Sequence, residues 1–306
     1  MKILLFIFFL VSSLLKAQEP IFSQLYMSGM YLNPALTGNV MGWQSSMQWR
    51  NQWPSIDGYV TSNIGVQKQL TKFNTGLGIK ILNDQAGNGT INTAAMGLNY
   101  SRGIAINKNF EFRIGSEVEF RQKSIDLSSV SFGDDIDNRY GFNPIDGDER
   151  PNNNNSYVNF GIGSDIKVFK GSFGFVLNNF FTPNESFTDS FQSPLPRKYT
   201  TYITYPVYSN DVVSLTPILM YQKQQDFQQL QIATATRYKL VTFYVGYRNQ
   251  DAFISGIGLA MKRLKIQYSY DLTVPKSLIA TGGSHELGIL FRFGSKDGYD
   301  DDRFIF

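Results

Sequence analysis

The sequence predicts an all-β protein, an outer-membrane β-barrel of about fourteen antiparallel strands with an N-terminal plug or periplasmic segment. Three observations support this class: an export signal, segments of about ten residues in which apolar and polar side chains alternate, and connections that alternate between short and long. A soluble β-sandwich also has alternating strands. The regular segment length, the export signal and the aromatic residues near strand ends favour the barrel.

Residues 1–17 have the features of a secretory signal peptide. Lys2 supplies the positive charge, residues 3–11 form a short apolar run, and Ala17 is a small residue before the expected cleavage site. Cleavage there makes Gln18 the new N-terminus. The apolar run is too short to span about 30 Å of hydrocarbon as a helix, so we expect export, and integration in the outer membrane of a Gram-negative cell after cleavage.

Composition excludes several classes of function. The chain has no cysteine, which excludes disulfides, thiol nucleophiles, cysteine-bound zinc and a lipid-modified N-terminal cysteine. Removing Lys2 and Lys16 from the 28 Lys and Arg residues leaves 26, against 25 Asp and Glu. A nearly neutral chain without a basic stripe gives no reason to expect nucleic acid as a partner.

The segment 18–40 is apolar but aperiodic, because Gly29, Pro34 and Gly38 interrupt any regular pattern. An apolar segment without its own periodicity has to pack against a larger structure. We expect it to enter the barrel from the periplasm and to lie inside or beneath the barrel mouth, where it would act as a plug.

Residues 41–293 form the predicted barrel. In the segment 264–272, for example, Leu264, Ile266 and Tyr268 share one face, while Lys265 and Gln267 share the other. The same alternation, weaker in the eighth and ninth segments, places strands near 41–51, 57–69, 72–83, 90–102, 108–124, 154–168, 171–181, 197–207, 211–224, 226–238, 240–249, 252–261, 263–273 and 284–293.

The connections between these strands are short near 70–71, 103–107, 169–170, 208–210, 239 and 262, and long at 84–89, 125–153, 182–196 and 274–283. Outer-membrane barrels place short turns in the periplasm and long loops outside. An even strand count then puts both chain ends on the short-turn side, and the tail 294–306 in the periplasm.

The predicted lumen face carries charges of both signs, which is unlike a selective ion pore. It is more typical of a wall that pairs with itself or with an inserted segment, and its members are Glu111, Arg113, Glu117, Glu119, Arg121, Lys265, Asp271, Glu286 and Arg292. Aromatic residues near strand ends suit the two membrane interfaces, namely Tyr59, Phe73, Tyr100, Phe110, Tyr199, Tyr247 and Phe293.

The sequence contains no recognisable catalytic motif, so we expect no enzyme and no cofactor. His285 is the only histidine, and its neighbours Ser284 and Glu286 point to the opposite face of a strand. An acidic loop between 126 and 155 could supply oxygen ligands to Ca²⁺, although its spacing differs from an EF-hand and a solvated loop is the commoner outcome. Its acidic residues are Asp134, Asp135, Asp137, Asp146, Asp148 and Glu149.

The N-terminal motifs carry a family resemblance. The stretch 21–39 resembles the mature N-terminus F-S-Q-x-Y…L-N-P-A-x-x-G of the PorP/SprF family of Bacteroidota, with matches at Phe22, Ser23, Gln24, Tyr26, Leu32, Asn33, Pro34, Ala35 and Gly38. The first strand is similar to that family's R-x-Q-W segment at Arg50, Gln52 and Trp53. The resemblance covers the whole chain in length and strand plan.

The resemblance implies a non-enzymatic outer-membrane component of the type IX secretion system. Family members act in secretion or surface attachment of cargo with a C-terminal sorting domain, such as the adhesins of gliding motility. Implied partners are such an adhesin, periplasmic components that include a peptidoglycan-binding lipoprotein, and outer-membrane lipid. The alternative is a FadL-like channel for hydrophobic solutes, since long-chain fatty acid channels also have fourteen strands and an Asn-Pro-Ala triplet in an N-terminal hatch.

Overall fold

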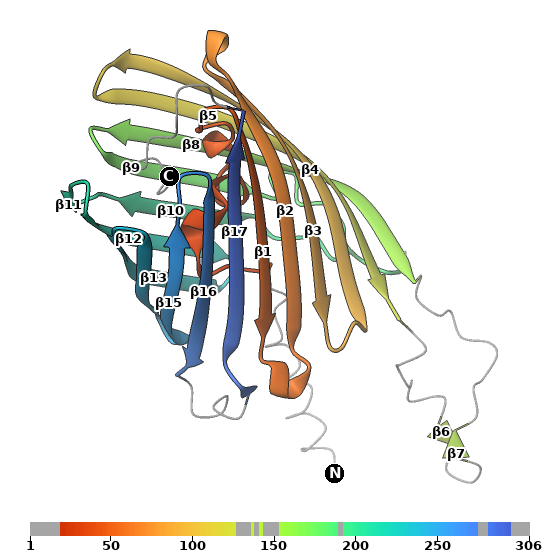
Figure 1. The fold of residues 1–306 in the computed structure, drawn as a ribbon. Helices are drawn as coiled ribbons and strands as arrows, with labels where there is room; N and C mark the ends of the chain where they lie inside the picture. Colours follow the sequence, from red (N-terminus) through yellow and green to blue (C-terminus); the bar gives the residue numbers. More distant parts are fainter. Residues whose placement is uncertain are drawn as a thin grey trace.

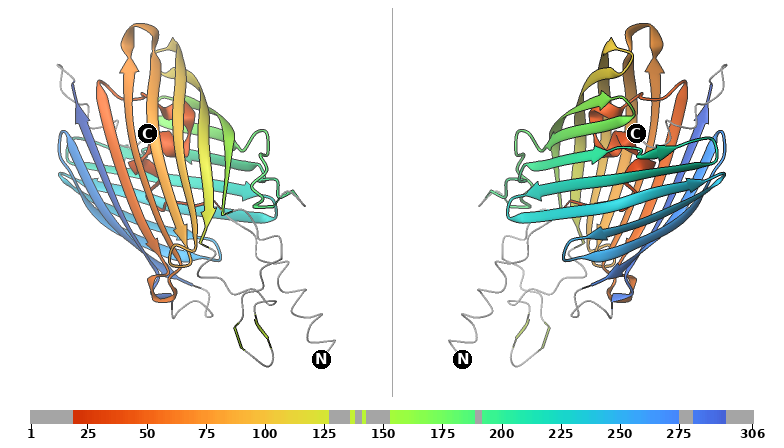
Figure 2. Two further views of the ribbon diagram at one scale, coloured as in Figure 1. Left: turned by 90° about the vertical axis from the view of Figure 1, so that its right-hand side faces the viewer. Right: turned by 90° about the vertical axis from the view of Figure 1, so that its left-hand side faces the viewer.

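The structure, a computed structural model, describes residues 19–126, 136–137, 141–142, 153–188, 192–274 and 281–294. Within these residues, fourteen antiparallel strands form one sheet that closes on itself (Figures 1 and 2). The first and last strands pair along their whole length, from Trp43 opposite Phe293 to Gln52 opposite Ser284. The predicted barrel and its strand number are therefore confirmed.

Each predicted strand is present, with ends that differ by a few residues. The barrel strands are β1 (Trp43–Gln52), β2 (Tyr59–Leu70), β3 (Thr75–Ala86), β4 (Ile91–Asn107), β5 (Phe110–Ile125), β8 (Asn154–Val168), β9 (Gly171–Asn178), β10 (Lys198–Thr204), β12 (Val213–Gln224), β13 (Phe227–Tyr238), β14 (Val241–Arg248), β15 (Ala252–Ala260), β16 (Leu264–Thr273) and β17 (Ser284–Phe293). The short strand β11 (Tyr208–Ser209) pairs with β12, and β6 (Ile136–Asp137) pairs with β7 (Gly141–Phe142) in a separate small sheet.

The alternation in the sequence is the reason for this architecture, and its polarity is the reverse of that in a soluble protein. Along β5, Ile114, Val118 and Phe120 are about half exposed on the outer face, whereas Arg113 and Glu119 are almost fully buried on the lumen face. Only hydrocarbon around the outer face makes this distribution favourable, since apolar side chains avoid water and charged ones need partners.

The two ends of the barrel differ in their connections. We name the end with the connections 71–74, 108–109, 169–170, 239–240 and 261–263 the turn end, and the opposite end the loop end. The loop end has the long connections near 126–153, 179–197 and 274–283, as predicted. The connection predicted as long at 84–89 is instead the short turn 87–90, and the connections at 225–226 and 249–251 are also short. The connection predicted at 103–107 is wrong, because β4 continues through these residues and the turn lies at 108–109. By the usual orientation of such barrels, the turn end faces the periplasm.

Short helices occur only before and between the strands in the described residues. They are η1 (Leu25–Met27), α2 (Gly29–Leu32) and η2 (Pro34–Leu36), followed by η3 (Pro54–Ile56) and η4 (Thr71–Phe73) in connections. No helix in the described part of the chain has the length and apolar character needed to cross a membrane. The expected signal peptide 1–17 with Ala17 and Gln18, and nearly all of the tail 294–306, lie outside the described residues.

Candidate functional site: the filled lumen

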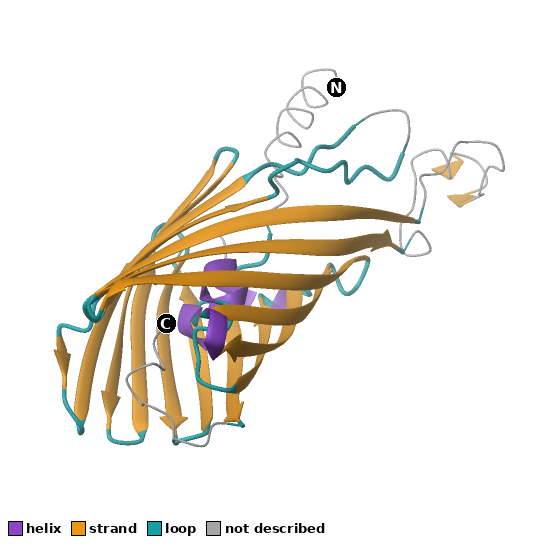
Figure 3. Cartoon of the chain, turned by 90° about the horizontal axis from the view of Figure 1, so that it is seen from above, coloured by secondary structure: helices purple, strands orange, loops and turns teal. Residues whose placement is uncertain are grey.

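The segment 19–40, which we name the lumen segment, lies inside the ring of strands. Its three short helices lie among the surrounding strands when the molecule is seen from above (Figure 3). Most of its side chains are buried, and Met27, Ser23 and Asn33 are fully so. The barrel wall supplies the surface against which this aperiodic apolar stretch packs.

The direction of the lumen segment differs from the expectation that both chain ends lie on the short-turn side. Glu19 contacts Lys198, the first residue of β10, and Gln224, the last of β12, and both belong to the loop end. Thr37 and Gly38 lie instead at the turn end, where the Thr37 carbonyl accepts a hydrogen bond from Ser101. The segment therefore runs through the lumen from the loop end to the turn end, where β1 begins.

Four buried charges from four strands hold the segment near the loop end. Arg50 of β1 lies 2.8 Å from Asp271 of β16 and 3.1 Å from Glu286 of β17, and Arg248 of β14 also pairs with Asp271. We name Arg50, Arg248, Asp271 and Glu286 the four-charge cluster. Each of these side chains is at most 3% exposed, so the cluster consists of two cations and two anions joined by three ion pairs, with no net charge and almost no contact with water.

The lumen segment completes this cluster. The Ser23 hydroxyl donates to Asp271 at 2.6 Å and accepts from Arg50 at 2.8 Å. The backbone N–H groups of Ser23 and Gln24 donate to the two carboxylate oxygens of Glu286 at 2.7 and 2.9 Å. Hydrogen bonds from two N–H groups to one carboxylate are charge-assisted and stronger than neutral ones. The segment thus supplies partners that the buried charges would otherwise lack.

A second set of polar contacts holds the segment at the turn end. Arg113 of β5 donates from Nε to the Ala35 carbonyl at 3.0 Å and from a terminal nitrogen to the Thr37 carbonyl at 3.1 Å. Asn33 donates to the Tyr202 hydroxyl at 3.0 Å and caps η2 by accepting from the Ala35 N–H at 2.9 Å. The Gly38 N–H donates to Gln67 at 2.7 Å. These bonds satisfy backbone groups that an aperiodic segment cannot pair internally.

Glycines in the wall let the segment approach this closely. A Cβ at Gly115 would lie 2.3 Å from the carbonyl carbon of Pro34, and one at Gly76 would lie 1.9 Å from the Thr37 carbonyl oxygen. Both glycines face the lumen on β5 and β3. Any larger residue there would displace the segment or the strand, because backbone atoms cannot rotate away as a flexible side chain can.

One side of the lumen is apolar, which is unusual for the interior of a barrel. Leu25, Tyr26, Met27, Leu32 and Leu36 of the segment form one cluster with residues of the wall, and the wall members are Tyr202, Ile218, Met220, Ala233, Ala235, Tyr244, Ile254 and Leu290. This cluster is a hydrophobic core between a plug and its barrel. Burying it stabilises the assembly by about 25 cal/mol for each Å² of apolar surface removed from water.

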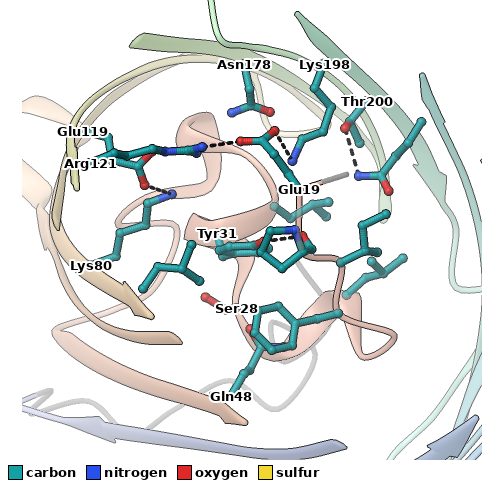
Figure 4. A pocket seen from close by; sticks show the side chains of 17 residues that line it. Glu19, Ser28, Tyr31, Gln48, Lys80, Glu119, Arg121, Asn178, Lys198 and Thr200 are labelled. Carbon is teal, nitrogen blue, oxygen red and sulfur yellow. Dashed lines mark hydrogen bonds and ion pairs between the residues drawn. The ribbon is translucent and has the colours of Figure 1, made fainter. Parts of the chain in front are cut away.

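Glu19 fastens the start of the described segment. Its carboxylate lies 2.6 Å from Arg121 of β5 and 2.9 Å from Lys198 of β10, and it accepts a hydrogen bond from Asn179 at 3.2 Å. Figure 4 shows it between the two cations, beside a cavity of about 40 Å³. A cavity of this size holds one or two water molecules and no larger ligand.

Most of the family-motif residues predicted from the sequence lie in the lumen. Gln52 and Trp53 lie outside it. Phe22 stacks edge-on against Tyr31 at 5.1 Å, and Lys265 lies 4.1 Å from the ring centre of Tyr26. Gln52 contributes only a long hydrogen bond of 3.4 Å from Arg50, and Trp53 lies in the connection after β1, against Tyr59. The sequence reasoning missed Glu19 and Asn179, which no motif marks, and it gave Lys198 no role as a partner of the segment.

The predicted mixed-sign wall is largely self-paired. Lys80 bridges Glu117 at 2.6 Å and Glu119 at 3.6 Å, while Arg121 also pairs with Glu119. Arg113 pairs with Glu111 at 3.1 Å, and Arg292 donates to Gln44 at 3.0 Å. The expectation that these charges pair with the wall or an inserted segment is confirmed for these residues.

His285 lies on β17, and its Nδ1 atom is 2.7 Å from the Tyr268 hydroxyl of β16. Among the described residues, His, Asp and Glu side chains form no group of three suited to a metal ion. The acidic loop with the candidate calcium ligands falls almost wholly outside the described residues, so that hypothesis stays a prediction.

Solved structures share this fold at low sequence identity. The toluene transporter TbuX of Ralstonia pickettii aligns with a TM-score of 0.51 and 10% identity, over 87% of this chain and 93% of the transporter. The CymD monoaromatic hydrocarbon channel aligns with a TM-score of 0.50 and 12% identity, over 92% and 95% of the two chains. At these identities the likeness concerns the fold alone. No curated protein matches the chain in sequence.

The closed ring of strands, its apolar outer face and its filled lumen define an outer-membrane β-barrel with an internal N-terminal segment. The family model described as type IX secretion system membrane protein PorP/SprF matches residues 14–291, and the chain belongs to this family. It is therefore an outer-membrane component of the type IX secretion system.

The direction of the lumen segment leads to a labelling prediction. The chain has no cysteine, so single cysteines can be introduced by Pro20→Cys next to Glu19 and by Met41→Cys at the turn end. With a membrane-impermeant maleimide, we expect Pro20→Cys to react on intact cells and Met41→Cys to react only after the outer membrane is permeabilised. Ser55→Cys, in an exposed connection of the loop end, is the positive control. Labelling of Pro20→Cys only after permeabilisation would contradict the direction described.

Proposed function

We propose that this barrel is a non-enzymatic accessory of type IX secretion that holds a secreted cargo protein at the cell surface. The cargo is an adhesin or related protein with a C-terminal sorting domain, of the kind used in gliding motility. It is held by the loop end of the barrel, while the turn end docks on periplasmic components of the machine, including a peptidoglycan-binding lipoprotein. Family membership over residues 14–291 supports this placement in the secretion system.

The observation that carries the proposal is the filled lumen. The segment is tied at the loop end by the four-charge cluster and Glu19, and at the turn end by Arg113. Between these ties it forms a hydrophobic core with the wall. A barrel that is filled in this way suits an anchor, because a transport channel has to leave room for its solute.

In this proposal the family-motif residues have a common role, which is to close the barrel. Arg50 belongs to the four-charge cluster, which Ser23 and Gln24 complete. Asn33 and Gly38 fit the segment into the turn end. The apolar residues of the motif pack in the core or lie against the glycines of the wall. These apolar residues are Phe22, Tyr26, Leu32, Pro34 and Ala35. Gln52 and Trp53 lie at the edge of this arrangement and fix the start of the connection after β1.

The alternative is a FadL-like channel for hydrophobic solutes. It is supported by the fold shared with TbuX and CymD and by the triplet Asn33-Pro34-Ala35. Against it, the triplet is held by Arg113 and Tyr202 rather than placed beside an open passage. The cavity beside the segment, at about 40 Å³, is too small for a fatty acid or an aromatic hydrocarbon.

Deletion of the gene in its own bacterium separates the two proposals. Surface proteins of wild-type and deletion cells are biotinylated with an impermeant reagent and identified by mass spectrometry, with uptake of a labelled fatty acid and of toluene measured in parallel. Anchoring predicts that one protein with a C-terminal sorting domain leaves the surface or appears in the medium, while uptake is unchanged. Normal surface display with reduced uptake would overturn anchoring and support the channel.

A further inference from the structure

The outer face of the barrel carries a groove near the turn end, across β1 to β5. Its volume is about 530 Å³, and its lining is almost entirely apolar on the outward side. The floor consists of Val66, Ile79, Leu98 and Leu77, which are neighbours on three adjacent strands. The groove is distinct from the lumen and from every contact of the lumen segment described above.

Two aromatic residues form walls of this groove. Trp43, the first residue of β1, is held between Phe293, at a ring distance of 6.0 Å, and the Lys68 ammonium, 4.8 Å from its ring centre. Tyr100 of β4 is 44% exposed and lies opposite Leu77 in the register. Trp43 lies at a strand end, where aromatic side chains of barrels reach the level of the lipid head groups, whereas Tyr100 lies within β4. The groove therefore begins at the membrane interface and continues into the hydrocarbon.

The charges at its turn-end border are of one sign. Lys68 lies opposite both Trp43 and Leu77, and Arg102 follows Tyr100 by two residues on the same outward face of β4. In the described stretch 43–125, the outward-facing charged side chains at the turn end are all basic, and they are Lys68, Lys72, Arg102 and Lys108. An apolar groove below a basic border matches an acyl chain attached to a phosphate.

We propose that this groove binds one phospholipid of the periplasmic leaflet. Its phosphate lies at Lys68 and Arg102, and one acyl chain lies in the groove between Trp43 and Tyr100. The position of the groove near the turn end determines which lipid it meets. The periplasmic leaflet consists of phospholipid, whereas lipopolysaccharide is confined to the outer leaflet. Basic side chains near a membrane surface attract anionic lipids.

Two kinds of variant test this site in the purified, full-length protein in detergent. Ser116→Trp fills the groove from β5, where Ser116 lines it and faces outward. The double variant Lys68→Glu with Arg102→Glu reverses the basic border. Ser255→Trp and Lys239→Glu are matched controls, because both positions face outward on the other side of the barrel.

The probe is phosphatidylglycerol, titrated into each protein and counted by native mass spectrometry. We expect one lipid to remain on the wild type and on both controls at a collision energy that strips the others. Both groove variants should lose it. For the double charge variant we expect an affinity lower by about ten-fold, as expected for loss of one or two contacts between a basic side chain and the lipid phosphate. Equal retention in the groove variants would overturn the site.

A photo-crosslinking amino acid at Leu98, in the floor, provides the second measurement in cells. Crosslinking to phospholipid supports the proposal. Crosslinking to lipopolysaccharide would place the groove in the other leaflet, and crosslinking to a protein would make it a protein interface, and either result would overturn the proposal. The lipid site lies on the outer surface of the barrel, whereas the anchoring proposal rests on the filled lumen. A negative result in this test would therefore not bear on the anchoring proposal.

Discussion

Replacing Arg50 by Met is expected to lower the free energy of unfolding by roughly 3–5 kcal/mol, the cost of breaking a buried ion pair on one side. The substitution keeps most of the volume of the side chain but leaves Glu286 without its cation and Asp271 with Arg248 alone. It also removes a hydrogen bond to Ser23. The measurement is a urea titration of protein folded into lipid vesicles, followed by tryptophan fluorescence.

Two further variants separate charge from volume in this prediction. Arg263→Met removes an exposed arginine in the connection between β15 and β16 and should change the free energy by less than about 0.5 kcal/mol. Adding Glu286→Gln to Arg50→Met restores neutrality in the cluster, so the double variant should be more stable than Arg50→Met alone. A double variant that is less stable, by the sum of the two single effects, would show that the cluster does not act through its charge balance.

The fold could be predicted from the sequence because the membrane imposes its alternation on every strand. In residues 111–120 of β5 and in β16 each lumen-facing charge is followed by an apolar residue, so the strand and the face of each side chain follow from the pattern. The long strand β8 was predicted with both its ends. Short strands such as β9 and β10 were less accurate, because irregular residues beside them extend the apparent pattern.

The site could be predicted only in part, because its partners are distant in sequence. Arg50 was marked by a motif, but its contacts with Asp271 and Glu286 arise when the ring closes and β1 pairs with β17. Alternation placed those acids on the lumen face without indicating which cation they meet. The direction of the lumen segment depends on Glu19 and its bridge to Lys198, a contact between residues far apart in the chain that no periodicity encodes.

Removal of the lumen segment is expected to turn the barrel into an open pore. A ring of fourteen strands encloses more space than its own side chains fill, since eight-stranded barrels are just filled and barrels of sixteen or more strands hold aqueous channels. Deleting 20–38 removes the segment and leaves the wall intact. We expect the deletion variant to show a stable single-channel conductance in a planar bilayer that is absent from wild type, whose lumen is occupied.

The deletion also exposes the apolar side of the lumen, so a variant that keeps the segment is needed beside it. Gly115→Ala places a Cβ 2.3 Å from the Pro34 carbonyl carbon and should displace the segment locally. Gly161→Ala is the matched control, because a Cβ there meets its first neighbour, the movable side-chain amide of Asn178, only at 3.2 Å. Frequent openings are expected with Gly115→Ala and not with Gly161→Ala.

The conductance of these four proteins, measured in the same bilayer, tests most directly whether the N-terminal segment closes the barrel. The predicted result is a silent wild type and Gly161→Ala variant, brief openings with Gly115→Ala, and a stable open pore after deletion of 20–38. Conductance of the deletion variant equal to that of wild type, with folding verified by its shift on unheated gels, would contradict the filled-lumen account.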